Sequence, residues 1–175
     1  MPITLPMKVQ TIYLKTMTKL SVLLIISLLA FCRCNRQPER ELPAFNLLLL
    51  DSTTVVNTGN IQPGKPVLII FFHTDCEYCQ RETEAIINNM NKLQNVRFYL
   101  VSIDPLSDIR FYRNYYHLGK FKNIVIGRDT GWYLPDHYPI KSTPYMQLYD
   151  KEDRLRGIMT GAIQMDTLLE KIKEL

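Results

Sequence analysis

Two cysteines separated by two residues, Cys76 and Cys79, are the side chains best suited to chemistry in this chain. They follow an apolar run of strand type at residues 67–72 and three polar residues, and they open a stretch that predicts a helix. This spacing at a helix start brings both sulfur atoms within bonding reach, with Cys76 the more exposed. N–H groups at the helix terminus favour negative charge, so the Cys76 thiol should ionise more readily than a free cysteine. The pattern predicts thiol–disulfide exchange.

A zinc site and a purely structural disulfide are the alternatives for this cysteine pair. Zinc needs two further ligands at suitable spacing, but Cys32 and Cys34 lie beside a targeting segment. A disulfide that closes so small a ring constrains little chain, and its stabilising effect is correspondingly small. We therefore favour redox exchange and expect neither a metal nor another cofactor. The three histidines are scattered along the chain, at His73, His117 and His137.

Residues 1–31 have the composition of an export signal. Residues 20–31 form an almost unbroken apolar run, which three lysines and no acidic residue precede. Twelve residues are too few to span a bilayer, which needs about 20. We expect the chain to be exported to the cell envelope, a compartment in which disulfides persist.

The end of this leader resembles the lipoprotein box of bacterial lipoproteins, in which a cysteine is lipidated and becomes the new N-terminus. The matching residues are 29–32 (LAFC), although Phe31 stands where a smaller residue is usual. The resemblance implies a lipid anchor on Cys32 that faces the periplasm, with Cys34 as a rival position. Ordinary secretion and an uncleaved anchor are the alternatives.

The charge and the length of residues 32–175 limit the kind of protein that follows the leader. The chain has 21 basic and 17 acidic residues, and removal of residues 1–31 leaves 18 against 17. This balance predicts no nucleic-acid partner and no polybasic membrane surface. Residues 32–42 are mostly polar and suit a tether. Residues 43–175 are enough for one domain.

Hydrophobic patterning in this domain predicts an α/β fold. Residues 67–72 are continuously apolar and suit a central strand buried on both faces. We expect an N-terminal β-hairpin extension at the sheet edge and a central mixed β-sheet flanked by helices on both faces. The other expected strands are 45–50, 53–56, 96–103, 123–126, 145–150 and 155–160, and the expected helices follow Cys76, cover about 109–119 and cover 163–173.

Residues 43–175 resemble a thioredoxin-like domain of the TlpA/redoxin type, which is common among exported bacterial proteins. Three segments carry the resemblance: 71–79 (FFHTDCEYC), 141–145 (KSTPY) and 150–157 (DKEDRLRG). The first follows a buried strand, the second matches the place of a cis-proline that faces the disulfide, and the third matches the closing hairpin. The resemblance implies the thioredoxin-like fold.

The resemblance also implies a role for each matched residue. Cys76 would attack a substrate disulfide and form a mixed disulfide, which Cys79 would resolve to give a redox-active Cys76–Cys79 disulfide. A cis Thr143–Pro144 bond would leave the backbone of Thr143 free to pair with the substrate chain.

The chain departs from thioredoxins at two positions that affect the chemistry. Asp75 stands where thioredoxins place a tryptophan, and Ile70 stands where they bury an acid that assists the resolving thiol. Glu77 is the nearest other candidate for that assistance, although it also suits the first turn of a helix simply as a carboxylate. Negative charges at Asp75 and Glu77 disfavour a thiolate on Cys76, which predicts a reducing couple.

Aromatic residues of the domain are expected to pack in the core and at its rim. This group includes Tyr112, Tyr115, Tyr116 and Tyr138. An alternative for Trp132, Tyr133 and Tyr145 is an apolar platform beside the active site that receives partner proteins.

The leading hypothesis is a cell-envelope thiol–disulfide oxidoreductase that reduces protein disulfides and receives electrons from an upstream membrane donor. A redox-inactive binding module and a copper chaperone are alternatives from a different class. A peroxiredoxin-type peroxidase is disfavoured, because His73 and Ile69 stand where those enzymes carry threonine and proline.

Overall fold

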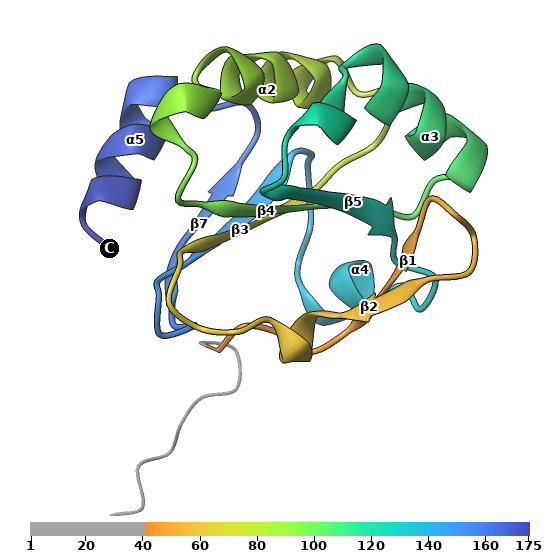
Figure 1. The fold of residues 1–175 in the computed structure, drawn as a ribbon, viewed down its shortest axis with the longest axis horizontal. Coiled ribbons are helices and arrows are strands. Elements are labelled where there is room, and N and C mark those ends of the chain that lie inside the picture. The colour runs from red at the N-terminus through yellow and green to blue at the C-terminus, as the bar shows by residue number, and fades with distance from the viewer. Residues whose placement is uncertain (1–40) are drawn as a thin grey trace, which may run out of the picture. The chain divides into compact units, whose positions relative to one another are not determined.

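The computed structural model describes residues 41–175, so the expectations for the leader, for Cys32 and for most of the tether lie outside the described residues. A seven-stranded mixed sheet with strand order β2-β1-β5-β4-β3-β6-β7 organises this part of the chain (Figure 1). Its strands are β1 (Asn46–Leu49), β2 (Val55–Asn57), β3 (Val67–Phe71), β4 (Arg97–Ser102), β5 (Ile124–Arg128), β6 (Tyr145–Tyr149) and β7 (Leu155–Thr160).

Strand β3 lies inside the sheet, parallel to β4 and antiparallel to β6. Strands β4 and β5 are parallel, whereas β6 and β7 form an antiparallel hairpin. Strands β1 and β2 form the expected hairpin at the sheet edge, and β1 also pairs with β5. The predicted mixed sheet and its N-terminal hairpin extension are therefore confirmed.

Helices cover both faces of this sheet, as predicted. The helices α2 (Glu77–Asn88), α3 (Leu106–Tyr115) and α5 (Met165–Lys173) lie on one face, and α4 (Tyr133–His137) lies on the other (Figure 1). Helix α4 was not expected from the sequence. It has only five residues, so no amphipathic repeat could develop along it.

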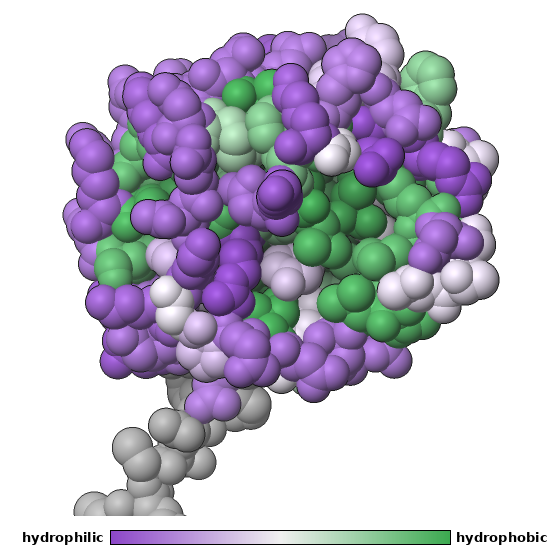
Figure 2. All heavy atoms as spheres, viewed as in Figure 1, coloured by the Kyte–Doolittle hydropathy of each residue, from purple (hydrophilic) through white to green (hydrophobic). Residues whose placement is uncertain are grey.

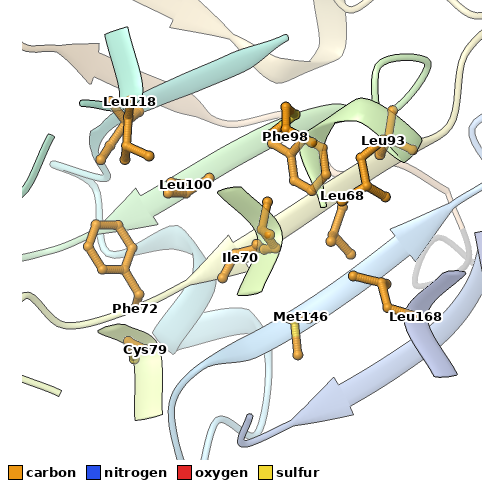
Figure 3. Close-up of a cluster of buried hydrophobic side chains, with 14 of the residues drawn as sticks. Leu68, Ile70, Phe72, Cys79, Leu93, Phe98, Leu100, Leu118, Met146 and Leu168 are labelled. Carbon is orange, nitrogen blue, oxygen red and sulfur yellow. The ribbon is translucent and has the colours of Figure 1, made fainter. Parts of the chain in front are cut away.

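Alternate side chains of β3 divide the apolar interior between the two faces. Leu68 and Ile70 join the cluster beneath α2, α3 and α5, whereas Val67 and Ile69 join a second cluster with Leu134 of α4. All five residues of β3 are buried, as the continuous apolar run predicted. Figure 3 shows the first cluster, with Cys79 beside Phe72 at one end of it. The core thus holds the N-terminal turn of α2 against the end of β3.

A hollow of about 560 Å³, lined by both apolar and charged residues, opens over β5 and the end of β1, where Figure 2 shows hydrophobic residues gathered at the surface. Strand β1 pairs with β5 at only two positions, so the remainder of β5 borders the hollow. Arg110 of α3 lines it and donates hydrogen bonds to the carbonyl oxygen of Leu50 at 2.7 and 3.1 Å. These bonds join α3 to the hairpin.

Within residues 41–175, no helix is both long and apolar enough to span a bilayer.

Candidate active site

Cys76 is the N-cap residue of α2, with an extended backbone (φ −79°, ψ 111°). Its sulfur accepts a hydrogen bond from the backbone N–H of Cys79, with an N–S distance of 3.3 Å. Sulfur here takes the place of the side-chain oxygen that usually caps a helix. The structure therefore puts Cys76 at the helix terminus, where the sequence placed it.

Thr143 approaches the same sulfur from the loop that leads into β6, 67 residues further along the chain. Its hydroxyl donates to Sγ of Cys76 at 3.4 Å, and the Cys76 thiol can donate to the carbonyl oxygen of Thr143 at 3.6 Å. The Thr143–Pro144 peptide bond is cis, as the resemblance implied. Cys76 and Thr143, distant in sequence, therefore meet at one site.

Cys79 lies one turn into α2 and is only 1% exposed. Burial, followed by the hydrogen bond to Cys76, raises the pKa of its thiol to about 12. Ile70, which stands where thioredoxins bury an acid, is itself 4% exposed in the same apolar cluster. The Cys79 thiol is therefore neutral, and Ile70 supplies no carboxylate to the cluster that both residues share.

The pKa of Cys76 shifts in the opposite direction. Partial burial acts to raise it, but hydrogen bonds from the Cys79 thiol, from Thr143 and from backbone N–H groups outweigh burial and lower it. Both cysteines are free thiols. The asymmetry makes Cys76 the more readily ionised thiol of the pair.

Asp75 and Glu77, predicted to support the site, flank Cys76 with exposed side chains. Neither is among the leading causes of the Cys76 pKa shift. The lowered pKa of Cys76 is therefore accounted for by the hydrogen bonds at its sulfur and not by these carboxylates.

Asp104 is a site residue that the sequence analysis did not identify. It follows β4, and its Oδ1 lies 2.7 Å from Nδ1 of His73. Its Oδ2 accepts from the backbone N–H of Thr74 at 2.7 Å and from the Thr74 hydroxyl at 2.9 Å. Burial acts to raise the pKa of Asp104, but these hydrogen bonds outweigh it and the pKa is lowered. Asp104 fixes the loop that leads into Cys76. Its position just after β4, the strand parallel to β3, is the sequence feature that could have identified it as a site residue.

Glu82 is the second residue that the sequence analysis missed. It lies one turn beyond Cys79 on the buried side of α2 and is 2% exposed. Its Oε2 accepts from the N–H of Ile163 at 2.9 Å, whereas Oε1 has no hydrogen-bond partner. Burial raises its pKa, and the bond from Ile163 only partly opposes this. The helical spacing of Cys79, Glu82 and Ile86 is the sequence feature that could have predicted that Glu82 lies on the buried side of α2.

The aromatic residues proposed as a platform are mostly core residues. Tyr133 stacks on Phe45 with ring centroids 5.3 Å apart, and Tyr145 is 3% exposed. Only Trp132 is exposed, at 51%. The packing interpretation is therefore confirmed for Tyr133 and Tyr145.

No group of three or more histidine, cysteine or carboxylate side chains is arranged to hold a metal ion within the described part of the chain. The sulfur of Cys76 is hydrogen-bonded instead to the backbone N–H of Cys79 and to the hydroxyl of Thr143.

Comparisons with known proteins find related sequences and similar folds. The chain is similar to the methylamine utilization protein MauD of Methylophilus methylotrophus, with 24% identity over 135 residues, and spans 61% of the length of that protein. A putative thioredoxin from Neisseria meningitidis superposes with a TM-score of 0.63 at 25% identity and covers 77% of this chain and 89% of its own. A secreted Mycobacterium tuberculosis disulfide oxidoreductase homologous to E. coli DsbE gives a TM-score of 0.62 at 18% identity and covers 75% and 96%.

A family model described as a thioredoxin-like domain matches residues 60–175, which include every residue of the site. The fold expected from the three sequence segments is confirmed by this match and by the superpositions. The chain belongs to the thioredoxin-like family.

Proposed function

We propose that this protein is a thiol–disulfide oxidoreductase in which Cys76 is the nucleophile and Cys79 the resolving thiol. The observation that carries the proposal is the opposite shift of the two pKa values, lowered at the partly exposed Cys76 and raised at the buried Cys79. A thiolate attacks and a neutral thiol does not, so the exposed sulfur reacts first.

The proposed reaction proceeds in two exchanges. The Cys76 thiolate attacks one sulfur of a client disulfide, forms a mixed disulfide and releases the other client sulfur as a thiolate. Cys79 then loses its proton and attacks Sγ of Cys76, which releases the second client thiolate and forms the Cys76–Cys79 disulfide. The client gains two electrons and the protein loses two. Turnover therefore requires a reductant, for which we propose an upstream membrane electron donor.

Substitution of each cysteine tests this assignment. Cys76→Ser should abolish reduction of a protein disulfide such as that of insulin, whereas Cys79→Ser should accumulate client proteins attached through Cys76. Non-reducing electrophoresis with mass spectrometry distinguishes the two. Adducts on Cys76→Ser but not on Cys79→Ser would reverse the roles and refute the proposal.

We further propose that the couple works as a reductant. The groups that stabilise the Cys76 thiolate are Thr143, the Cys79 thiol and N–H groups, while Asp75 and Glu77 place negative charge beside it. A strongly oxidising couple needs a much more stable thiolate. Equilibration with glutathione should give a potential nearer about −270 mV than about −120 mV. A value above about −180 mV would contradict reduction.

The cell envelope is the proposed location, with residues 1–31 as leader, 32–42 as tether and a lipid on Cys32. The leader composition supports this, and one of the superposed proteins is described as secreted. Fatty-acid labelling that is lost in Cys32→Ala would support the anchor. Labelling that is lost only in Cys34→Ala would assign the lipid to Cys34 instead. Absence of fatty-acid labelling in the wild-type protein would exclude a lipid anchor.

A further inference from the structure

A pocket of about 390 Å³ opens between the start of α2 and the exposed side of α3. Asp75, the residue before Cys76, lines one wall together with Gln80. Gln80 is held in place, because its amide donates to the carbonyl oxygen of Thr74 at 3.1 Å. The pocket therefore begins one residue away from the position at which a client cysteine would be attached.

Aromatic rings of α3 form the opposite wall. Phe111 is 71% exposed and Tyr115 is 65% exposed, and their rings stack with centroids 6.1 Å apart. Tyr116 packs against Tyr115 at 4.9 Å and against Tyr112 at 4.7 Å. The Tyr112 hydroxyl donates to the carbonyl oxygen of Cys79 at 3.1 Å, which fixes the base of this aromatic wall to α2. Adjacent large rings left in solvent mark a binding surface more often than rings exposed singly.

The charge around these rings is negative. Asp75 and Asp108 line the pocket, and no lysine or arginine is among the described residues that line it. Glu84 is also near, since burial and then the Glu84 charge raise the pKa of Tyr116. Arg81 and Arg110, each next in sequence to a residue that lines the pocket, are engaged elsewhere, because Arg81 lies over the ring of Tyr78 and Arg110 binds the Leu50 carbonyl.

We propose that this pocket binds a lysine or arginine side chain of the client polypeptide, close in sequence to the cysteine that Cys76 attacks. The inference rests on the proposed function. A cation meets both features of the pocket, because it is attracted to the faces of aromatic rings and to carboxylates. A neutral apolar side chain would use the rings but leave the carboxylates unpaired, and an acidic side chain would be repelled.

The test measures how fast the reduced full-length protein cleaves symmetrical peptide disulfides. Each peptide carries one cysteine, with lysine, norleucine or glutamate placed in turn at each neighbouring position on either side. Norleucine has a similar length to lysine but no charge. At one or more positions the lysine peptide should react about tenfold faster than the norleucine peptide, which corresponds to about 1.4 kcal/mol. The glutamate peptide should be the slowest, and higher ionic strength should reduce the lysine preference.

Variants assign the preference to the pocket. The double variant Asp75→Asn, Asp108→Asn should bring the lysine-to-norleucine rate ratio close to one, and Phe111→Ala should lower it. The double variant Glu170→Gln, Glu174→Gln removes the same two charges at exposed positions on α5 and its C-cap, and it should keep the wild-type ratio.

Four results would overturn the inference. Equal rates for lysine and norleucine at every position would refute it and leave the proposed function intact, as would a preference for norleucine. A lysine preference that survives in the double variant would place its cause elsewhere. If no peptide is reduced, the proposed function fails and the inference fails with it.

Discussion

Removal of the Thr143 hydroxyl is the sharpest test of how the site stabilises its thiolate. Thr143→Val keeps the shape of the side chain and the Pro144 neighbour but deletes the donor that lies 3.4 Å from Sγ of Cys76. A partly exposed hydrogen bond of this kind contributes about 0.5–1.5 kcal/mol. Because one pKa unit equals about 1.36 kcal/mol, the Cys76 pKa should rise by about 0.4–1.1 units.

The same loss should shift the redox potential. A less stable thiolate disfavours the reduced form, so the couple should become more reducing, by about 10–30 mV at a pH where Cys76 is ionised. The pH dependence of iodoacetamide alkylation measures the pKa, and equilibration with glutathione measures the potential. Ser142→Ala, an exposed neighbouring position, should change neither. An unchanged or lowered Cys76 pKa in Thr143→Val would refute the assignment of Thr143 as a donor to the thiolate.

Two further variants test the buried carboxyl and the loop anchor. Glu82→Gln keeps an acceptor for the Ile163 N–H. Because the folded-state pKa of Glu82 is raised, the contribution of this carboxyl to the stability of the wild-type protein is lost as the pH rises through that pKa. In urea unfolding, the variant should therefore gain stability relative to wild type between pH 5 and pH 8. A constant difference across this range would contradict the raised pKa. Asp104→Asn should destabilise the protein by about 1.5–3 kcal/mol at pH 7, because hydrogen bonds to a charged acceptor are weakened. The Asp104 pKa is lowered, so this difference should fall away as the pH drops below about 4, and a difference that persists there would show that the charge is not its cause.

The parts of the fold predicted from the sequence are those with a local pattern. The continuous apolar run of β3 is buried on both faces, and the Cys-x-x-Cys pair begins a helix, because both depend on residues adjacent in sequence. The short helix α4 and the ends of the edge strands had no such pattern. Strand β2, for example, covers Val55–Asn57 where residues 53–56 were expected.

The sequence predicted the cysteines of the candidate site and the cis-proline bond beside them, but not the two carboxylates Asp104 and Glu82. Cys76, Cys79 and the Thr143–Pro144 bond came from motifs. Asp104 lies 31 residues from His73, and only the parallel pairing of β3 with β4 makes them neighbours. Glu82 differs from other helix-surface glutamates only in its helical spacing from Cys79, and the chain segment at Ile163 that covers it comes 81 residues later. Long-range pairing of this kind cannot be predicted from local composition.

The burial of Cys79 in the core beneath α2 links the direction of electron flow to the thermal stability of the protein. Oxidation and unfolding form a thermodynamic cycle. If the Cys76–Cys79 disulfide forms more favourably in the folded chain than in the unfolded chain, it must stabilise the fold by the same free energy. If the couple is a reductant, as proposed, the oxidised protein should melt at a higher temperature than the dithiol form. A strongly oxidising couple would reverse the order. Two melting curves of the isolated protein, one under oxidising and one under reducing conditions, would thus indicate which way electrons pass before any client or donor is known.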